Sequence, residues 1–165
     1  MRQIYLDKVV LNMGVGRSGP AIEAAKKALD QITAKQSCAR NAREAQRDFG
    51  VRKGEPIGVA VTVRREEAST LLERLLRAKG NVLRARSFDE FGNFSFGIAE
   101  HIDIPSVKYD PEVGILGMDV SVSLQRPGYS VRTRSRHKAR VGGSHRISSD
   151  EAREFVVNKF GVKLE

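Results

Sequence analysis

Two segments of the chain alternate strictly between large apolar side chains and small or polar ones. In residues 57–64 (IGVAVTVR), isoleucine or valine occupies every odd position. Residues 117–125 (GMDVSVSLQ) show the same alternation, with methionine, valine or leucine at the even positions. A period of two residues is typical of a β-strand, because successive side chains point to opposite faces of a sheet. The sequence therefore predicts a sheet with one apolar face and one face of small or polar side chains.

Amphipathic helices are predicted between these strands. Residues 20–34 and 66–79 carry apolar side chains at spacings of three and four, which is the helical period. Residues 148–151 (SSDE) form a capping-box pattern, so a last helix is expected to begin there and to end at Gly161. Residues 8–13 and 95–104 are predicted to form two more strands, and residues 105–114 a turn-rich connection.

The order of these elements predicts the fold class. The order is strand, helix, strand, helix, strand, strand, helix. This order favours an α+β fold, in which a mainly antiparallel open sheet has helices packed on one face. A chain of 165 residues without an internal repeat is expected to form a single domain, residues 1–165. Helices would cover the valine and leucine face. The other sheet face would stay free, carrying Asn12, Gly58, Ala60, Thr62, Arg64, Ser121, Ser123 and Gln125.

The charge balance indicates a nucleic-acid partner. The chain has 29 Lys and Arg against 20 Asp and Glu, a net charge of +9 and a pI near 10.0. Such a pI is typical of proteins that bind nucleic acid, although a merely soluble basic protein is the alternative. The only cysteine, Cys38, fits a reducing compartment. No signal peptide or apolar run of membrane-spanning length is visible, so we expect a cytoplasmic location and no membrane partner.

Positive charge is densest in residues 126–147, here called the basic segment. No acidic residue lies between Val120 and Ser149. Uncompensated cations repel one another, and a polyanion relieves this repulsion while releasing its counterions. The alternative is a solvated, disordered loop, but a position inside the fold favours RNA. We expect RNA contacts from Arg126, Arg132, Arg134, Arg136, Lys138, Arg140 and Arg146.

Residues 35–55 form a second basic stretch, here called the protruding loop. This stretch is polar and has no clear apolar period, so a long exposed loop is predicted, flanked at most by short strands. Loops of this length in compact domains are usually functional or disordered. Three acidic residues dilute its charge, and whether it contacts a second RNA stays open on these residues alone. Its basic residues are Lys35, Arg40, Arg43, Arg47, Arg52 and Lys53.

The sequence offers little support for catalysis. Residues 14–19 (GVGRSG) have the form of a dinucleotide-binding fingerprint, but no strand ending in an acidic residue follows at the required distance. The predicted role is a tight turn whose backbone amides come close to a phosphate. The three histidines are scattered and Cys38 is isolated, so neither a metal site nor a catalytic triad is indicated. We expect no cofactor, no metal and no enzymatic activity.

Four phenylalanines, Phe88, Phe91, Phe94 and Phe96, lie close together in residues 87–97 (SFDEFGNFSFG). Such a cluster could stack on bases, but it does not fit the pattern of an RNA-recognition motif. We therefore expect these rings to pack a turn onto the core.

Several long motifs, in the same order, resemble the universal ribosomal large-subunit protein five family, which binds 5S ribosomal RNA. The resemblance covers nearly all of residues 2–164. The matching segments are KVVLNMGVG (8–16), NAREAQRDFGVRKGEPIG (41–58), VTVR (61–64), SFDEFGNFSFGIAEHIDI (87–104), KYDPEVGILGMDV (108–120), RPGY (126–129), HKARVG (137–142) and HRIS (145–148).

The resemblance implies a fold, a function and partners. Members have an antiparallel sheet backed by helices, and they are structural constituents of the large subunit, in its central protuberance. It implies 5S rRNA binding through Asn12, Thr62 and Arg64 of the sheet, with Arg40 and Arg43 nearby. It also implies contact between the protruding loop and peptidyl-site tRNA, through Arg47, Arg52 and Lys53. Large-subunit rRNA and neighbouring ribosomal proteins are the other partners implied.

The chain departs from the family pattern after its first predicted helix. Members commonly have T-G-Q-x-P, where this chain has Thr33, Ala34, Lys35, Gln36 and Ser37. The RPGY to HRIS block is similar to the archaeal and eukaryotic branch, and the short N-terminus favours the archaeal one.

Overall fold

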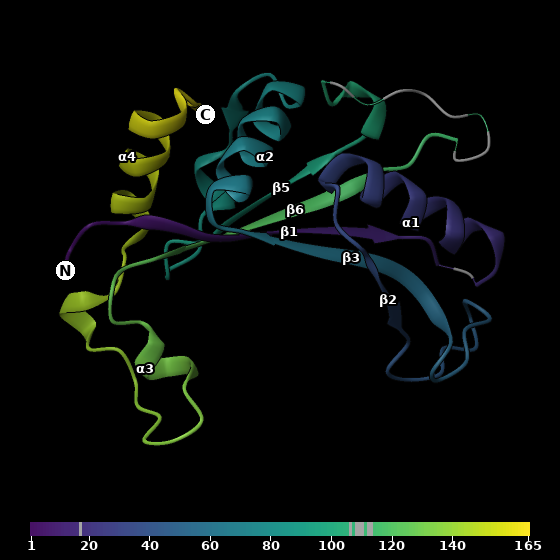
Figure 1. Cartoon of the computed structure of the whole chain (residues 1–165), viewed down its shortest axis with the longest axis horizontal. Coiled ribbons are helices and arrows are strands. Elements are labelled where there is room, and N and C mark those ends of the chain that lie inside the picture. The colour runs from purple at the N-terminus through teal and green to yellow at the C-terminus, as the bar shows by residue number, and fades with distance from the viewer. Residues whose placement is uncertain (17, 106, 108–110, 112–113) are drawn as a thin grey trace.

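A five-stranded sheet forms the centre of the molecule (Figure 1) in a computed structural model that describes residues 1–16, 18–105, 107, 111 and 114–165. All four neighbouring pairs in the strand order β2-β3-β1-β6-β5 are antiparallel. A separate parallel pair joins two short strands near the C-terminus. The strands are β1 (Tyr5–Gly14), β2 (Cys38–Asn41), β3 (Pro56–Arg64), β4 (Val82–Leu83), β5 (Phe94–Ile98), β6 (Met118–Gln125) and β7 (Lys163–Leu164).

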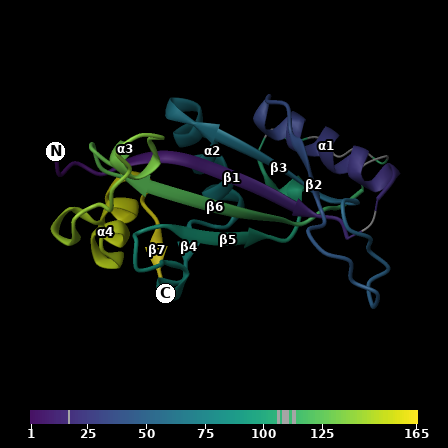
Figure 2. The same cartoon turned by 90° about the horizontal axis from the view of Figure 1, so that it is seen from below.

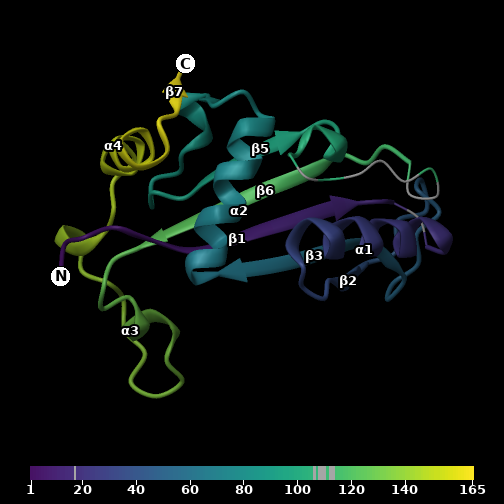
Figure 3. The same ribbon diagram turned by 45° about the horizontal axis from the view of Figure 1, so that its top comes forward.

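The longer helices α1 and α2 lie on one side of this sheet, and the short helix α3 lies on the other (Figure 1). α1 and α2 cover one face, and α4 lies beyond one end of the strands (Figures 1 and 3). The α-helices are α1 (Pro20–Thr33), α2 (Arg65–Ala78), α3 (Ser130–Thr133) and α4 (Ser149–Phe160). Single 3-10 turns are η1 (Ala85–Ser87), η2 (His101–Asp103) and η3 (Gly143–His145).

The core lies between the sheet and these helices. Alternate residues of β1, β3 and β6, such as Leu11, Val61 and Val120, are buried. They pack against the apolar stripes of α1 and α2, which include Leu29 and Leu72. Burial of these large side chains supplies most of the driving force for the fold. The predicted α+β class, with an antiparallel sheet and helices on one face, is confirmed.

The second face of the sheet is uncovered, and we call it the open face. Seen from below (Figure 2), the strands lie in front of the helices. The strand register places Lys8 between Arg64 of β3 and Ser123 of β6, and Asn12 between Ala60 and Asp119. The predicted polar face therefore exists, and Lys8, Val10 and Asp119 belong to it as well. Gly58 and Ala60, which were expected to stay free on this face, are buried beside β2.

Two stretches differ from the predictions. The strand expected at residues 95–104 ends at Ile98, because His101 is buried and its Nδ1 accepts a hydrogen bond from the Leu116 amide at 3.3 Å. The backbone turns into η2 at that point. The protruding loop contains β2, which pairs with β3 at the edge of the sheet. Most of the turn-rich connection predicted at residues 105–114 lies outside the described residues.

Candidate nucleic-acid interface

A half-buried carboxylate organises one end of the open face. The pairing of β1 with β6 shifts register between Leu6 and Lys8, so Asp7 is the extra residue of a β-bulge. A bulge changes the direction in which the side chain of its extra residue points. Asp7 there accepts hydrogen bonds from Arg64 Nη1 at 3.2 Å and from Gln125 Nε2 at 3.0 Å. The Arg64 side chain remains 55% exposed. Arg64 is thus held in place and partly neutralised by Asp7, while its outer side stays accessible.

The basic segment is anchored by a tyrosine. Tyr129 is buried, and its hydroxyl donates to the His145 carbonyl at 3.2 Å. The same hydroxyl accepts from the Ile147 amide at 3.1 Å. These bonds join the two ends of the segment, and the His145 ring packs edge-on to the tyrosine. The two ends of the segment are therefore held against each other, and the exposed cations lie on the stretch between them.

Arg126 corrects one sequence prediction. Its residue exposure is 4%, and its Nη2 donates to Glu151 Oε1 at 2.8 Å. Nη1 donates to the carbonyls of His145 and Arg146. Hydrogen bonds from the Ser148 amide and then from Arg126 hold the pKa of Glu151 below its ordinary value. Arg126 thus ties the basic segment to α4 and is not available to a phosphate, contrary to expectation.

The other cations of the basic segment remain accessible at the surface of the molecule. Arg132, Arg134, Arg136, Lys138 and Arg140 are exposed, and so is Arg146. Within the residues that the structure describes, no ion pair joins any of them to a carboxylate. The hydrogen bonds found for Arg134 and Arg146 go to backbone carbonyls of the same segment. The segment therefore presents uncompensated positive charge on the side of the open face (Figure 1).

The protruding loop continues the hairpin of β2 and β3. Backbone hydrogen bonds pair Ala42 with Glu55 and Gln46 with Val51, and a turn follows at the tip. Phe49 near this tip is 79% exposed. The basic residues Arg40, Arg43, Arg47, Arg52 and Lys53 are exposed, whereas Lys35 forms an ion pair with Glu67 of α2. The loop and the basic segment extend from opposite ends of the sheet (Figures 1 and 2).

Two amides of the glycine-rich turn already have partners in β3. Val15 and Gly16 both donate to the Ile57 carbonyl, at 3.0 and 2.9 Å. Ser18 donates to Glu55, and this bond, with one from the Arg52 amide, lowers the pKa of Glu55. The predicted phosphate contact is wrong for the amides of Val15 and Gly16, because the hairpin already uses them.

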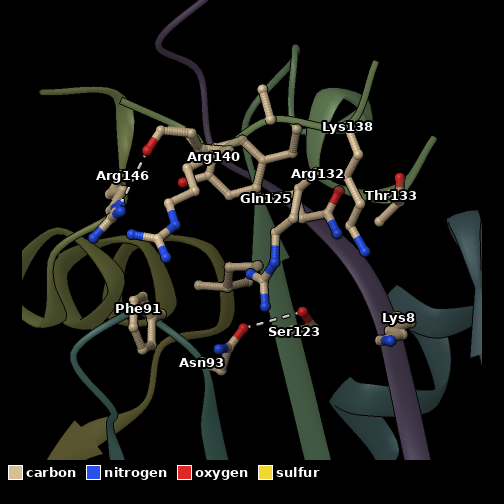
Figure 4. Close-up of a pocket in the computed structure, with 14 residues that line it drawn as sticks. Lys8, Phe91, Asn93, Ser123, Gln125, Arg132, Thr133, Lys138, Arg140 and Arg146 are labelled. Carbon is tan, nitrogen blue, oxygen red and sulfur yellow. Dashed lines mark hydrogen bonds between the residues drawn. The ribbon is translucent and has the colours of Figure 1, made fainter. Parts of the chain in front are cut away.

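A pocket of about 470 Å³ lies where the basic segment meets the open face (Figure 4). Lys8, Ser123 and Gln125 line it from the sheet, and Phe91 and Asn93 line it from the turn before β5. Its remaining polar lining comes from the basic segment: Tyr129, Arg132, Thr133, Lys138, Arg140 and Arg146.

Sequence reasoning missed three of these residues. Phe91 is 51% exposed, so the expectation that all four phenylalanines pack on the core is wrong for this one. Phe88, Phe94 and Phe96 are buried and stacked as expected. Lys8 could have been found from its even spacing to Asn12 on the same strand. Asn93 carried no comparable signal.

A wider hollow of about 910 Å³ extends over the middle of the open face. Asn12, Arg40, Ser95, Ser121 and Arg84 are among its lining residues. Asp119 also lines it, so this part of the face is polar but less positive than the pocket beside the basic segment. Thr62 lies exposed on the same face, as predicted.

The described residues contain neither a metal-binding cluster nor a membrane-spanning helix. No group of three or more histidine, cysteine, aspartate or glutamate side chains is placed to hold a metal ion in that part of the chain. Among the described residues, no helix combines the length and apolar character needed to cross a membrane.

Comparisons with known proteins give a consistent result. One family model, described as ribosomal protein L5, matches residues 1–52, and a second, described as the C-terminus of the same ribosomal family, matches residues 56–158. A large ribosomal subunit protein uL5 from Cenarchaeum symbiosum is 65% identical over 99% of this chain and 97% of its own length. The uL5 protein of Nitrosopumilus maritimus is 64% identical over 99% of this chain and 95% of its own length. The uL5 protein of Pyrobaculum aerophilum is 48% identical over 100% of this chain and 92% of its own length. All three organisms are archaea, the branch that the sequence favoured.

Proposed function

The chain belongs to the ribosomal protein L5 family, so it is a structural ribosomal protein and not an enzyme, and from this premise we propose how it works in the large subunit. The open face and the exposed cations of the basic segment bind 5S rRNA in the central protuberance. The protruding loop contacts peptidyl-site tRNA. Large-subunit rRNA and neighbouring ribosomal proteins complete its surroundings in the cytoplasmic ribosome. No cofactor takes part.

One observation carries the 5S rRNA proposal. A polar, uncovered sheet face adjoins a segment whose exposed cations have no carboxylate partner among the described residues. Folding an arginine-rich segment into a defined conformation keeps like charges close together, which is unfavourable without a polyanion. Phosphates relieve that repulsion and release their counterions to solution. The sheet then supplies hydroxyl and amide groups, such as Thr62 and Asn12, for contacts beside the phosphates.

The tRNA proposal rests on the protruding loop. Its hairpin hydrogen bonds hold Arg47, Arg52 and Lys53 away from the sheet. The exposed Phe49 ring adds a surface on which a nucleotide can pack. A loop that projects beyond the 5S rRNA surface can reach a second RNA without competing for the first.

The first experiment is a titration of the protein with 5S rRNA over a range of salt concentrations. If about six phosphates are contacted, the slope of log K against log salt is expected to be about −4 to −5. Replacing Arg132, Arg136, Lys138 and Arg140 by alanine should make this slope shallower by about 3 to 4, because each cation accounts for roughly one phosphate.

Three exposed cations outside the basic segment, the protruding loop and both hollows, Arg77 of α2, Lys159 of α4 and Lys163 of β7, provide the control, called the helical-side variant. Their triple alanine variant should bind 5S rRNA with an unchanged slope. If the native chain binds 5S rRNA no more tightly than random RNA of equal length, the proposal is contradicted. Such a result would favour a general RNA chaperone instead.

A further inference from the structure

The pocket between the basic segment and the open face is more specialised than phosphate binding requires. Five cations line it, and none of the described residues that line it is a carboxylate. In Figure 4, the side chains of Arg132, Arg140 and Arg146 point toward the space above Phe91 and Asn93. The backbone of an RNA helix can rest on an open surface, whereas a concave site of about 470 Å³ is of the size that encloses a small ligand. Its occupant should therefore be anionic and about as large as one nucleotide.

A rigid turn holds an exposed aromatic ring at the wall of this pocket. Asp89 Oδ1 accepts hydrogen bonds from the amides of Phe91 and Asn93, at 2.9 and 2.7 Å. Gly92 has a φ of +76°, and a β-carbon there would lie 2.6 Å from Ile147 Cγ2, so the turn packs directly on the end of the basic segment. The hydrogen-bonded turn thus presents a half-exposed aromatic ring, as base-stacking platforms in RNA-binding proteins do.

A second flat group faces this ring. The Arg146 guanidinium lies 6.0 Å from the Phe91 ring centroid, and Arg146 Nε donates to the Val141 carbonyl at 3.2 Å. Stacked flat groups touch at about 3.5–4.0 Å, so a base between the two requires about 7–8 Å. The present gap is only slightly smaller, and a small rotation of the flexible arginine side chain widens it.

Two amide side chains in the pocket are oriented in advance. Asn93 Nδ2 donates to Asp89 at 2.8 Å, while its Oδ1 accepts from Ser123 at 3.0 Å. Gln125 Nε2 donates to Asp7 at 3.0 Å. An amide has two N–H donors and an oxygen with two lone pairs, so each group retains donor and acceptor capacity. Such groups match the mixed donors and acceptors along the edge of an unpaired base.

We propose that this pocket binds a single unpaired nucleotide extruded from the bound RNA, an inference that rests on the RNA-binding function proposed above. The base inserts between Phe91 and Arg146, with the amides of Asn93 and Gln125 near its edge. Arg132, Lys138 and Arg140 hold the adjoining phosphates. The basic segment then recognises a local feature of RNA structure as well as its charge.

The test compares RNA hairpins that differ by one bulged nucleotide, prepared with each of the four bases. The native chain should bind at least one bulged hairpin about 5- to 100-fold more tightly than the fully paired hairpin, the range expected for stacking one base on an aromatic ring. Phe91→Leu keeps the apolar contact but removes the flat ring, so it should abolish this preference without changing affinity for the paired hairpin. Phe160→Leu makes the same change on α4, outside the pocket lining and the proposed RNA contacts, and should keep the preference.

The outcomes separate the pocket from the wider function. Equal binding of bulged and paired hairpins by the native chain, or a preference that survives Phe91→Leu, overturns the pocket proposal. The native chain could instead show a bulge preference that depends on Phe91 but no preference for 5S rRNA over random RNA. That result overturns the 5S assignment and supports the pocket. Millimolar nucleoside monophosphates should reduce the bulge preference more than equal inorganic phosphate does, because a free nucleotide competes with the extruded one for the same pocket. An equal effect of phosphate would overturn the proposal, because the pocket would then bind charge and not a base.

Discussion

Ala34 ends helix α1 in the left-handed conformation, with φ 52° and ψ 26°. The family resemblance places a glycine at this position. A β-carbon in this conformation lies too close to the following carbonyl, at a cost of about 1–2 kcal/mol, and glycine avoids that cost. The amide of Ala34 still donates to the Asp30 carbonyl at 2.8 Å, so the helix closes normally around a strained residue.

Ala34→Gly is therefore expected to raise the free energy of unfolding by about 0.5–1 kcal/mol, because the relief of strain exceeds the extra entropy that glycine gives the unfolded chain. Urea unfolding of the isolated protein measures the change. Ala24→Gly, the same substitution inside α1, should lower stability by about 1 kcal/mol. A loss of stability at both positions would show that the Ala34 backbone is unstrained.

Single arginines could not be assigned correctly from their positions in the chain. Arg126 lies in the densest basic stretch, yet its carboxylate partner, Glu151, is 25 residues away and reaches it only through α4. Arg64 meets Asp7 across 57 residues because of a bulge in β1. Local charge patterns predict that a surface is basic. Which cations stay free depends on tertiary pairing, which those patterns do not encode.

At the scale of elements, periodicity and end signals predicted most of the fold. The capping box at Ser148 is present, with its side chain accepting from the Glu151 amide and Glu151 accepting from the Ser148 amide. The short helix α3 and the β4–β7 pair gave no signal, because two to four residues are too few to establish a period. The protruding loop was expected as an exposed stretch, but its hairpin extension depends on pairing with β3.

The protruding loop supports a prediction of its own. Replacing Arg47, Arg52 and Lys53 by alanine should speed dissociation of peptidyl-site tRNA from assembled ribosomes about 5- to 100-fold, because three exposed charge contacts are each worth a few tenths to about 1 kcal/mol. Affinity of the isolated protein for 5S rRNA should change less than about twofold at fixed salt, since the loop lies beyond the surface that binds this RNA. The helical-side variant of Arg77, Lys159 and Lys163 should leave both quantities unchanged.

An equal loss of tRNA retention and 5S rRNA affinity would contradict this division of labour. It would place the protruding loop within the 5S rRNA surface and not beyond it.

At the scale of the whole molecule, both family regions contribute to one surface. The region matched over residues 1–52 supplies β1 and β2, and the region over residues 56–158 supplies β3, β5 and β6. β1 lies between β3 and β6, so neither region completes the sheet without the other. The open face, with Asn12 from one region and Thr62 from the other, therefore forms only when the chain folds as a unit.

An electron cryo-microscopy map of the large subunit containing this chain tests the central claim most directly. We predict that 5S rRNA lies against the open face, with its phosphates within about 4 Å of cations among Arg132, Arg134, Arg136, Lys138 and Arg140, the separation that defines a direct ion pair. The outer surfaces of α1 and α2 should face away from it. A map with 5S rRNA on the helical side, or with the open face buried against another protein, would contradict the account.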